Sequence, residues 1–248
     1  MTSPSHRILL ALLPLVLPAA ALAQEQREKQ TNNGFPGAFS GNVGFVSDYT
    51  FRGISQTREK PALQGGVDYK HPSGAYAGVW GSSVDFNDTD RASLEIDGYA
   101  GYSQQLTDQL SGDVRFIYYA YPGAKSNLDY DYYELYGALT YNFGIPKITA
   151  SVNYSPDYFA GSGQGVYTAL SAEYPLVYGF GLSGHVGRQF IDDRVRFGTP
   201  SYNEWAAGVG YDWRGFNVKL QYVDTDLKTT ECADGCDAKG VLSVTYAF

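Results

Sequence analysis

The chain has 248 residues, with 22 Tyr, 13 Phe and 29 Gly against a single Met, and its formal net charge is −8. Many tyrosines and glycines with few long aliphatic helix formers favour an all-β protein. A chain this acidic is a poor nucleic-acid binder, because phosphate contacts need clustered Lys and Arg.

The first 23 residues predict a secretory signal peptide. His6 and Arg7 form a weakly basic start, an apolar core follows over Ile8 to Leu17, and Ala21-Leu22-Ala23 reads as a cleavage site. Removal of this segment takes away one Arg and no acid, which leaves a net charge of −9. No later apolar run approaches the ~20 residues of a transmembrane helix. The mature chain is therefore expected to be either a soluble exported protein or a transmembrane β-barrel.

Residues 24–39 are polar and are expected to form a flexible periplasmic lead-in, and residues 40–248 to form the barrel. From Gly41 onward, apolar and polar residues alternate with the period of two that a β-strand produces. In the first expected strand Asp48 and Arg52 share the polar face. Each expected strand is near the length of a tilted strand that spans a bilayer. The twelve expected strands cover residues 41–52, 62–69, 75–85, 93–103, 110–121, 132–143, 147–155, 166–174, 180–190, 204–213, 216–223 and 240–248.

The connections between these strands alternate between short and long. Short ones cover residues 71–74, 105–109, 144–146, 175–179 and 214–215, and long ones cover 53–61, 86–92, 122–131, 156–165, 192–203 and 224–239. Short turns on one rim and longer loops on the other are typical of outer-membrane β-barrels, in which the short turns are periplasmic. The pattern predicts a closed antiparallel barrel of about twelve strands. Ten or fourteen strands remain the alternative, because residues 175–179 and 192–203 have soft boundaries.

Aromatic side chains at both ends of an apolar strand face predict contact with lipid. One such face consists of Trp205, Ala207, Val209, Tyr211 and Trp213. A soluble barrel would place its apolar face inside, but the signal peptide and the aromatic ends favour lipid outside. Lipid offers no hydrogen bonds, so the sheet must close and pair every strand edge.

The last strand, 240–248, alternates apolar Leu242, Val244 and Tyr246 and ends at Phe248. This ending resembles the terminal strand of Gram-negative outer-membrane barrels. The resemblance implies insertion into the outer membrane by the barrel-assembly machinery, which would recognise Phe248. Membrane lipid and lipopolysaccharide are then the expected surroundings of the outer face.

The least generic stretch is 43–57, which contains S-D-Y-T-F-R-G-I-S-Q-T from Ser47 to Thr57. It resembles the amino-terminal signature S-x-Y-x-F-R-G-x-S-x-T of the TorF family of porin-like proteins. The resemblance implies an outer-membrane, pore-forming protein whose solute is undefined. From the residues themselves, Asp48 and Arg52 either frame a polar site in the pore or tie the first loop to the barrel wall.

The polar strand faces carry nine acids and six bases, counting Asp48 and Arg52. A wet channel lined by these charges would pass small polar solutes with a weak cation preference, whereas a filled interior would pair them with one another. The expected pore-lining residues are Asp48, Arg52, Glu95, Asp97, Asp113, Arg115, Glu134, Lys147, Glu173, His185, Glu204 and Lys219.

Cys232 and Cys236 lie in the longest loop and are expected to form an exposed disulfide, because the chain is exported. Two thiols without a nearby His make a poor metal site. Acidic residues in this loop and around Asp85, Asp88 and Asp90 could hold Ca²⁺, but no EF-hand spacing is present and a solvated acidic rim is the favoured interpretation. No metal site and no cofactor is predicted.

The sequence favours a porin-like channel for passive diffusion of small hydrophilic solutes and not an enzyme. The alternative is a non-conducting structural or surface-interaction barrel. A third possibility is a lipid-modifying enzyme, since Ser183 and His185 share a strand face. However, Leu182 and Val186 occupy the opposite face, which turns Ser183 and His185 inward.

Overall fold

The computed structural model describes residues 36–86, 92–232 and 234–248. The expected signal peptide, 1–23, and most of the expected lead-in lie outside the described residues. The first strand begins at Ala38, two residues before the expected start of the barrel at residue 40.

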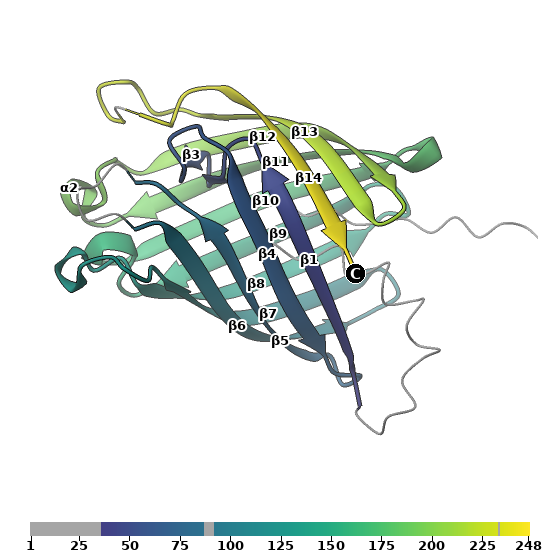
Figure 1. The fold of residues 1–248 in the computed structure, drawn as a ribbon. Coiled ribbons are helices and arrows are strands. Elements are labelled where there is room, and N and C mark those ends of the chain that lie inside the picture. The colour runs from purple at the N-terminus through teal and green to yellow at the C-terminus, as the bar shows by residue number, and fades with distance from the viewer. Residues whose placement is uncertain (1–35, 87–91, 233) are drawn as a thin grey trace, which may run out of the picture.

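Twelve strands form one closed barrel in which each strand pairs antiparallel with its neighbours in the chain (Figure 1). β1 and β14 close it, with Phe45 opposite Val244, and Gly41 and Phe248 exchange two backbone hydrogen bonds. The wall strands are β1 (Ala38–Val46), β4 (Ala62–Lys70), β5 (Ala75–Ser83), β6 (Leu94–Gln105), β7 (Leu110–Ala120), β8 (Tyr132–Asn142), β9 (Lys147–Ser155), β10 (Gly165–Pro175), β11 (Phe180–Ile191), β12 (Tyr202–Trp213), β13 (Phe216–Thr225) and β14 (Lys239–Ala247).

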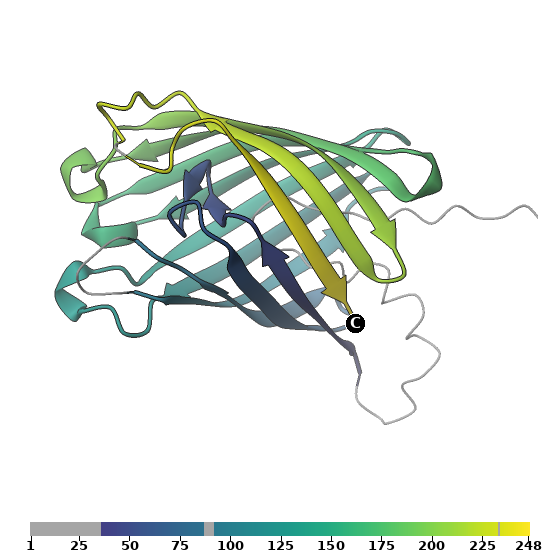
Figure 2. The same cartoon turned by 45° about the horizontal axis from the view of Figure 1, so that its top comes forward.

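The remaining elements are short and lie between the wall strands. Four are single helical turns: η1 (Ser126–Leu128), η2 (Phe159–Gly161), η3 (Val177–Gly179) and α2 (Arg194–Phe197). Two two-residue strands, β2 (Thr50–Phe51) and β3 (Ile54–Ser55), pair only with each other. They form a small hairpin at the long-loop end of the barrel, apart from the wall (Figures 1 and 2).

The predicted alternation of short and long connections is confirmed. Residues 71–74, 106–109, 143–146, 176–179 and 214–215 turn at one rim, called here the short-turn rim. The long connections, including 47–61 and 226–238, gather at the opposite rim, called here the long-loop rim. The first expected strand is wrong in one respect, because the wall strand ends at Val46 and not at Arg52. The chain turns into the barrel there and forms the β2–β3 hairpin.

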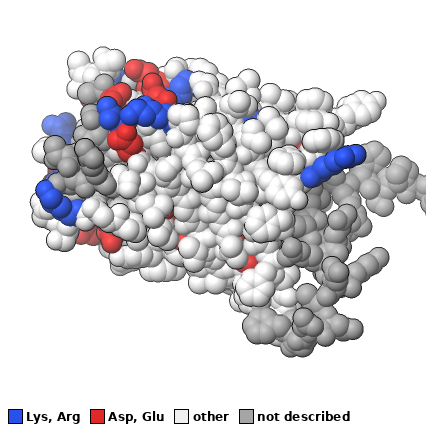
Figure 3. Space-filling model, in the orientation of Figure 1, with Lys and Arg blue, Asp and Glu red and all other residues white. Residues whose placement is uncertain are grey.

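The outer surface of the wall is apolar, as the alternation predicted. On β12, Val209, Tyr211 and Trp213 are exposed, whereas Glu204 and Ala206 on the other face are buried. A space-filling view shows few charges along the wall and a cluster of charges at the long-loop rim (Figure 3). Such a surface suits lipid better than water, because large apolar patches are rare on soluble monomers.

A cluster of aromatic side chains fills part of the interior of the barrel. Tyr49, Trp80, Tyr119 and Tyr132 are buried in one cluster, and the rings of Tyr119 and Tyr132 stack with their centroids 4.4 Å apart.

No helix among the described residues is long and apolar enough to cross a membrane. Within the same ranges, no group of three or more His, Cys, Asp or Glu side chains is arranged to hold a metal ion.

A charge placed on the outer wall tests which face meets lipid. Leu220 lies at the middle of β13 and is 55% exposed, whereas Val195 on α2 is 83% exposed at the long-loop rim. We expect Leu220→Arg to lower the free energy of unfolding in lipid vesicles by about 2–4 kcal/mol, because a cation at the bilayer midplane loses its hydration. Val195→Arg should change it little. Equal effects of the two substitutions in urea titrations would contradict a lipid-facing wall.

Candidate functional site: the barrel interior

Residues 47–61, called here the inner loop, leave the wall after β1 and fold into the barrel. The β2–β3 hairpin turns through Arg52 and Gly53, whose φ angles are 49° and 81°. Two consecutive positive φ angles define the type I′ turn that suits a two-residue hairpin. Gly53 is required there, because a Cβ atom at this position would lie 2.5 Å from the Thr225 side chain. The hairpin tip is therefore pressed against the β12–β13 wall.

Arg52 holds the inner loop to the far side of the barrel. Its Nη2 donates to both carboxylate oxygens of Glu134 on β8, at 2.8 and 2.7 Å. Its Nη1 donates to Gln189 Oε1 on β11 at 2.7 Å, and its guanidinium lies 4.3 Å from the centre of the Tyr167 ring. The Tyr202 hydroxyl donates to the Arg52 carbonyl oxygen at 3.0 Å. Arg52 is 4% exposed, so this is an ion pair shielded from solvent.

Asp48 accepts hydrogen bonds from other residues of the inner loop and does not form an ion pair with Arg52. Its Oδ1 accepts hydrogen bonds from Ser55 Oγ at 2.6 Å and Thr57 Oγ1 at 2.8 Å. Lys239 on β14 approaches its other oxygen at 3.8 Å. The expectation that Asp48 and Arg52 share the inner face of a wall strand is therefore wrong. Both belong to the inner loop, and the arrangement agrees with the alternative in which they tie that loop to the wall.

Tyr49 attaches the inner loop to a third part of the wall. Its hydroxyl donates to Glu95 Oε1 on β6 at 2.7 Å, and its ring packs edge-on against Trp80 on β5. Burial, and after it the charge of Glu95, raise the pKa of Tyr49 well above its ordinary value. The hydroxyl therefore stays protonated and remains a donor. Together, Tyr49 and Arg52 connect the inner loop to strands spread along the wall from β5 to β11.

The residues that carry the TorF resemblance all take part in this arrangement. Ser47 Oγ accepts from the Leu242 backbone, and Phe51 packs edge-on against Tyr119. Ser55 and Thr57 bond to Asp48, as described above. The signature therefore describes an inward-folded loop in this protein, whereas its alternating pattern alone predicted a continuous wall strand.

The other expected pore-lining residues lie on wall strands with their side chains inside the barrel. Glu95 and Asp97 are on β6, Asp113 and Arg115 on β7, Glu134 on β8 and Lys147 on β9. Glu173 is on β10, His185 on β11, Glu204 on β12 and Lys219 on β13. Their neighbours along each strand face outward, which follows from the two-residue period of a strand.

Most of these acids accept hydrogen bonds from nearby donors. Glu134 accepts from Asn153 Nδ2 at 2.8 Å as well as from Arg52. Glu204 accepts from Tyr167 and lies 2.6 Å from His185 Nε2. Asp97 differs, since its buried Oδ1 has no hydrogen-bond partner in the part of the chain that the structure describes.

A second polar cluster lies nearer the short-turn rim. The Tyr76 hydroxyl donates to Asp113 Oδ1 at 2.7 Å and accepts from Arg115 Nε at 2.9 Å. The Arg115 guanidinium also lies 4.8 Å from the centre of the Tyr136 ring. The side chains of three further expected residues, Lys147, Glu173 and Lys219, form no hydrogen bond or ion pair with any described residue.

Several residues of the interior are absent from the expected pore-lining set. Gln189, Asn153 and Tyr158 all help to surround Arg52 or Glu134. Gln189 and Asn153 lie on inward faces, so their strand parity could have revealed them. Tyr158 comes from the connection after β9, whose path has no sequence period that would place it.

Ser183 and His185 do point inward, as the sequence indicated. No hydrogen bond joins them within the described residues, and His185 Nε2 is occupied by Glu204. Both lie inside the barrel, away from the lipid-facing wall. The arrangement lacks the nucleophile–base contact that hydrolysis by Ser183 would need.

The predicted disulfide between Cys232 and Cys236 is present, with their Cα atoms 6.2 Å apart. The expectation that it is exposed is wrong for Cys236, which is 3% exposed because it packs with Tyr202 and Leu227. The disulfide loop also rests on the inner loop, since Ser55 donates its backbone N–H to the Gly235 carbonyl oxygen at 2.8 Å.

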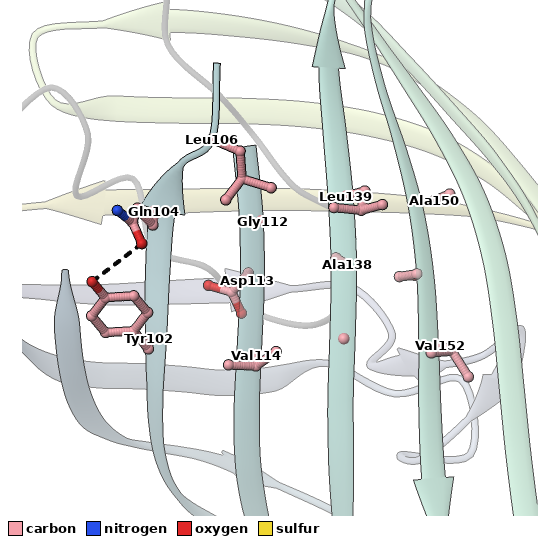
Figure 4. A pocket seen from close by; sticks show the side chains of 12 residues that line it. Tyr102, Gln104, Leu106, Gly112, Asp113, Val114, Ala138, Leu139, Ala150 and Val152 are labelled. Atoms are coloured by element: carbon pink, nitrogen blue, oxygen red, sulfur yellow. Dashed lines mark hydrogen bonds between the residues drawn. The ribbon is translucent and has the colours of Figure 1, made fainter. Parts of the chain in front are cut away.

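A shallow hollow lies on the outer wall across β6 to β9 (Figure 4). Gly112, Gly137 and Ala150 line it together with larger outward side chains such as Leu106 and Leu139. Its lining belongs mainly to the lipid-facing surface, so it is separate from the polar interior.

These features define a closed twelve-stranded antiparallel barrel similar to outer-membrane porins. A structure of the KdgM porin matches with a TM-score of 0.58 and 9% identity, over 84% of this chain and 99% of its own. A KdgM porin in complex with disordered oligogalacturonate matches with a TM-score of 0.57 and 8% identity, over 85% and 99%. An outer membrane channel from Pseudomonas putida F1 gives a TM-score of 0.49 and 11% identity, over 86% and 95%.

The chain belongs to the family described as bacterial protein of unknown function (Gcw_chp), whose model matches residues 30–248. That description does not include the name TorF, which therefore stays a resemblance. No curated protein sequence matches the chain.

The buried ion pair between Arg52 and Glu134 can be tested by a double-mutant cycle. Arg52→Ala should lower the free energy of unfolding by about 3–5 kcal/mol, because it leaves the carboxylate of Glu134 buried and unpaired. Glu134→Ala should act similarly, and the double variant should lose less than the sum of the two. The measurement is urea unfolding of the detergent-folded barrel. Additive losses would show that the two side chains do not interact.

The disulfide between Cys232 and Cys236 can be tested by maleimide labelling of intact cells. Untreated wild-type protein should not react with a maleimide, whereas reduced protein should. Each single variant leaves one free thiol. The Cys232 thiol that remains in Cys236→Ser should react faster than the Cys236 thiol that remains in Cys232→Ser, because Cys236 is only 3% exposed. Labelling of untreated wild-type protein would contradict the disulfide.

Proposed function

We propose that this protein is an outer-membrane channel through which small hydrophilic solutes diffuse passively. The observation that carries the proposal is the barrel itself, which is apolar outside and lined inside by charged and hydroxyl-bearing side chains. The fold is similar to that of the KdgM porin over 84% of this chain. The TorF resemblance of residues 47–57 supports the same class.

The proposed location is the outer membrane, with the short-turn rim in the periplasm and the long-loop rim outside the cell. The separation of short turns from long loops supports this orientation. Phe248 ends the closing strand next to Gly41, where the barrel-assembly machinery would recognise it. Lipid and lipopolysaccharide would surround the apolar wall.

The inner loop would narrow the path near the long-loop rim. Its side chains reach β6, β8 and β11, so solutes must pass beside the inner loop or displace it. In the proposed channel, a constriction of this kind would limit the size of the solutes that can pass. The rest of the interior carries polar and small side chains together with inward tyrosines such as Tyr76, Tyr99 and Tyr136.

A non-conducting structural barrel is the second candidate, because the same buried contacts could fill the interior permanently. An enzyme has less support, since Ser183 and His185 lack a mutual hydrogen bond in the described chain. Conductance separates the first two candidates.

Single-channel recording in planar bilayers tests the proposal. Wild-type protein should give small, steady conductance steps, and Arg52→Ala should enlarge them because the inner loop loses its attachment to β8 and β11. Arg194→Ala serves as the control, since Arg194 is an exposed arginine at the same rim. Silence of folded wild-type protein and of folded Arg52→Ala at every voltage and salt concentration would favour the non-conducting barrel.

A further inference from the structure

Lys219 is a buried cation without a protein partner. It lies on the inward face of β13 and is 6% exposed, and its side chain forms no hydrogen bond or ion pair with any described residue. A mostly buried charge is costly unless a counter-ion, a polar group or water accompanies it. The partner of Lys219 must therefore be something that enters the interior, either water or an anionic solute.

A glycine on β12, Gly208, leaves space for the Lys219 side chain. A Cβ atom on Gly208 of β12 would lie 3.2 Å from Lys219 Cε and 2.6 Å from Gln221 Cγ. The side chain of Lys219 therefore passes across Gly208, towards β11. Any larger residue at position 208 would push the ammonium group away from this position.

Three more polar groups lie on β9, β10 and β11, the strands that follow β12 on the side towards which the Lys219 side chain passes. Glu173 on β10 is directly opposite Lys147 on β9 and Ser183 on β11 in the register of the sheet. Buried atoms of two of them, Glu173 Oε1 and Ser183 Oγ, have no hydrogen-bond partner among the described residues. Glu173 lies within the electrostatic influence of both lysines but forms no ion pair with either. The set carries two cations against one anion.

This set lies close to the short-turn rim. Lys147 is the first residue of β9, and Glu173 is two residues from the end of β10. It is therefore away from the inner loop, which occupies the other half of the barrel. A solute entering from the short-turn rim would meet these side chains before it reached the Arg52 contacts.

We propose that Lys147 and Lys219 bind the carboxylate of a small hydroxylated organic acid inside the barrel. Ser183 Oγ donates a further hydrogen bond to this carboxylate, and Glu173 accepts one from a hydroxyl group of the same solute. The inference rests on the proposed channel function and names its solute class. With this site, the channel is expected to prefer anions, in place of the weak cation preference expected from the count of charges. The reason is that most of the counted acids near the inner loop already accept hydrogen bonds from protein donors.

Binding of gluconate tests the site, with sorbitol as the uncharged probe of similar size. Isothermal titration of the detergent-folded full-length barrel should show saturable binding of gluconate and at least tenfold weaker binding of sorbitol. Lys219→Met should weaken gluconate binding about tenfold. Lys70→Met removes an exposed lysine at the same rim and should change nothing.

A second measurement shows whether Lys219 has a merely structural role. Lys219→Met should not lower the free energy of unfolding, because it removes a buried charge that has no protein partner. In bilayers, the reversal potential under a KCl gradient should indicate anion preference for wild type and shift towards cation preference in Lys219→Met. Lys219→Arg should retain gluconate binding and anion preference.

The outcomes separate this inference from the channel proposal. Gluconate binding without conductance would support the site and overturn the channel. Conductance without gluconate binding, or equal losses in Lys219→Met and Lys70→Met, would overturn the site and leave the channel. A loss of stability in Lys219→Met would indicate a structural role and would also overturn the inference.

Discussion

Closure of the sheet is the constraint on which the other features depend. The apolar wall suits lipid, and lipid cannot satisfy the backbone groups of an unpaired strand, so β1 must meet β14. Once the sheet closes, every second side chain of each strand points into a confined space. The charges and tyrosines of the chain then have only one another, water or a solute as partners. The interior of this barrel is consequently dense with hydrogen bonds.

The inner loop is the main consequence of that confinement. A loop that left the barrel would expose Phe51 and leave the Glu134 carboxylate buried opposite Asn153 without a cation. By folding inward, it supplies Arg52 to Glu134 and Tyr49 to Glu95. Arg52 adopts a positive φ of 49° to do so, a conformation that costs free energy in a non-glycine residue. The strain is offset by the contacts of its guanidinium group.

The pairing of charges changes the electrostatic character expected from composition. Near the inner loop, Glu134 and Glu204 are each occupied by protein donors, so their charge is less available to a passing ion. Near the short-turn rim, Lys147 and Lys219 have no such partners among the described residues. A count of acids and bases treats all of these groups alike. The selectivity of a narrow channel instead depends on which charges remain unpaired.

The alternation of residues in this sequence was enough to predict the twelve wall strands, their inward and outward faces and the two rims. These features are local, because a strand's two-residue period and the turn residues between strands can be read from neighbouring positions. The path of residues 47–61 was not predictable in this way. Its alternation continues past Val46, but its partners Glu95, Glu134 and Gln189 are 46, 82 and 137 residues away from the residues they contact. Likewise, nothing local shows that Lys219 lacks a partner while Arg52 has several. Only the closed barrel decides these contacts, because it alone brings distant strands face to face across one interior.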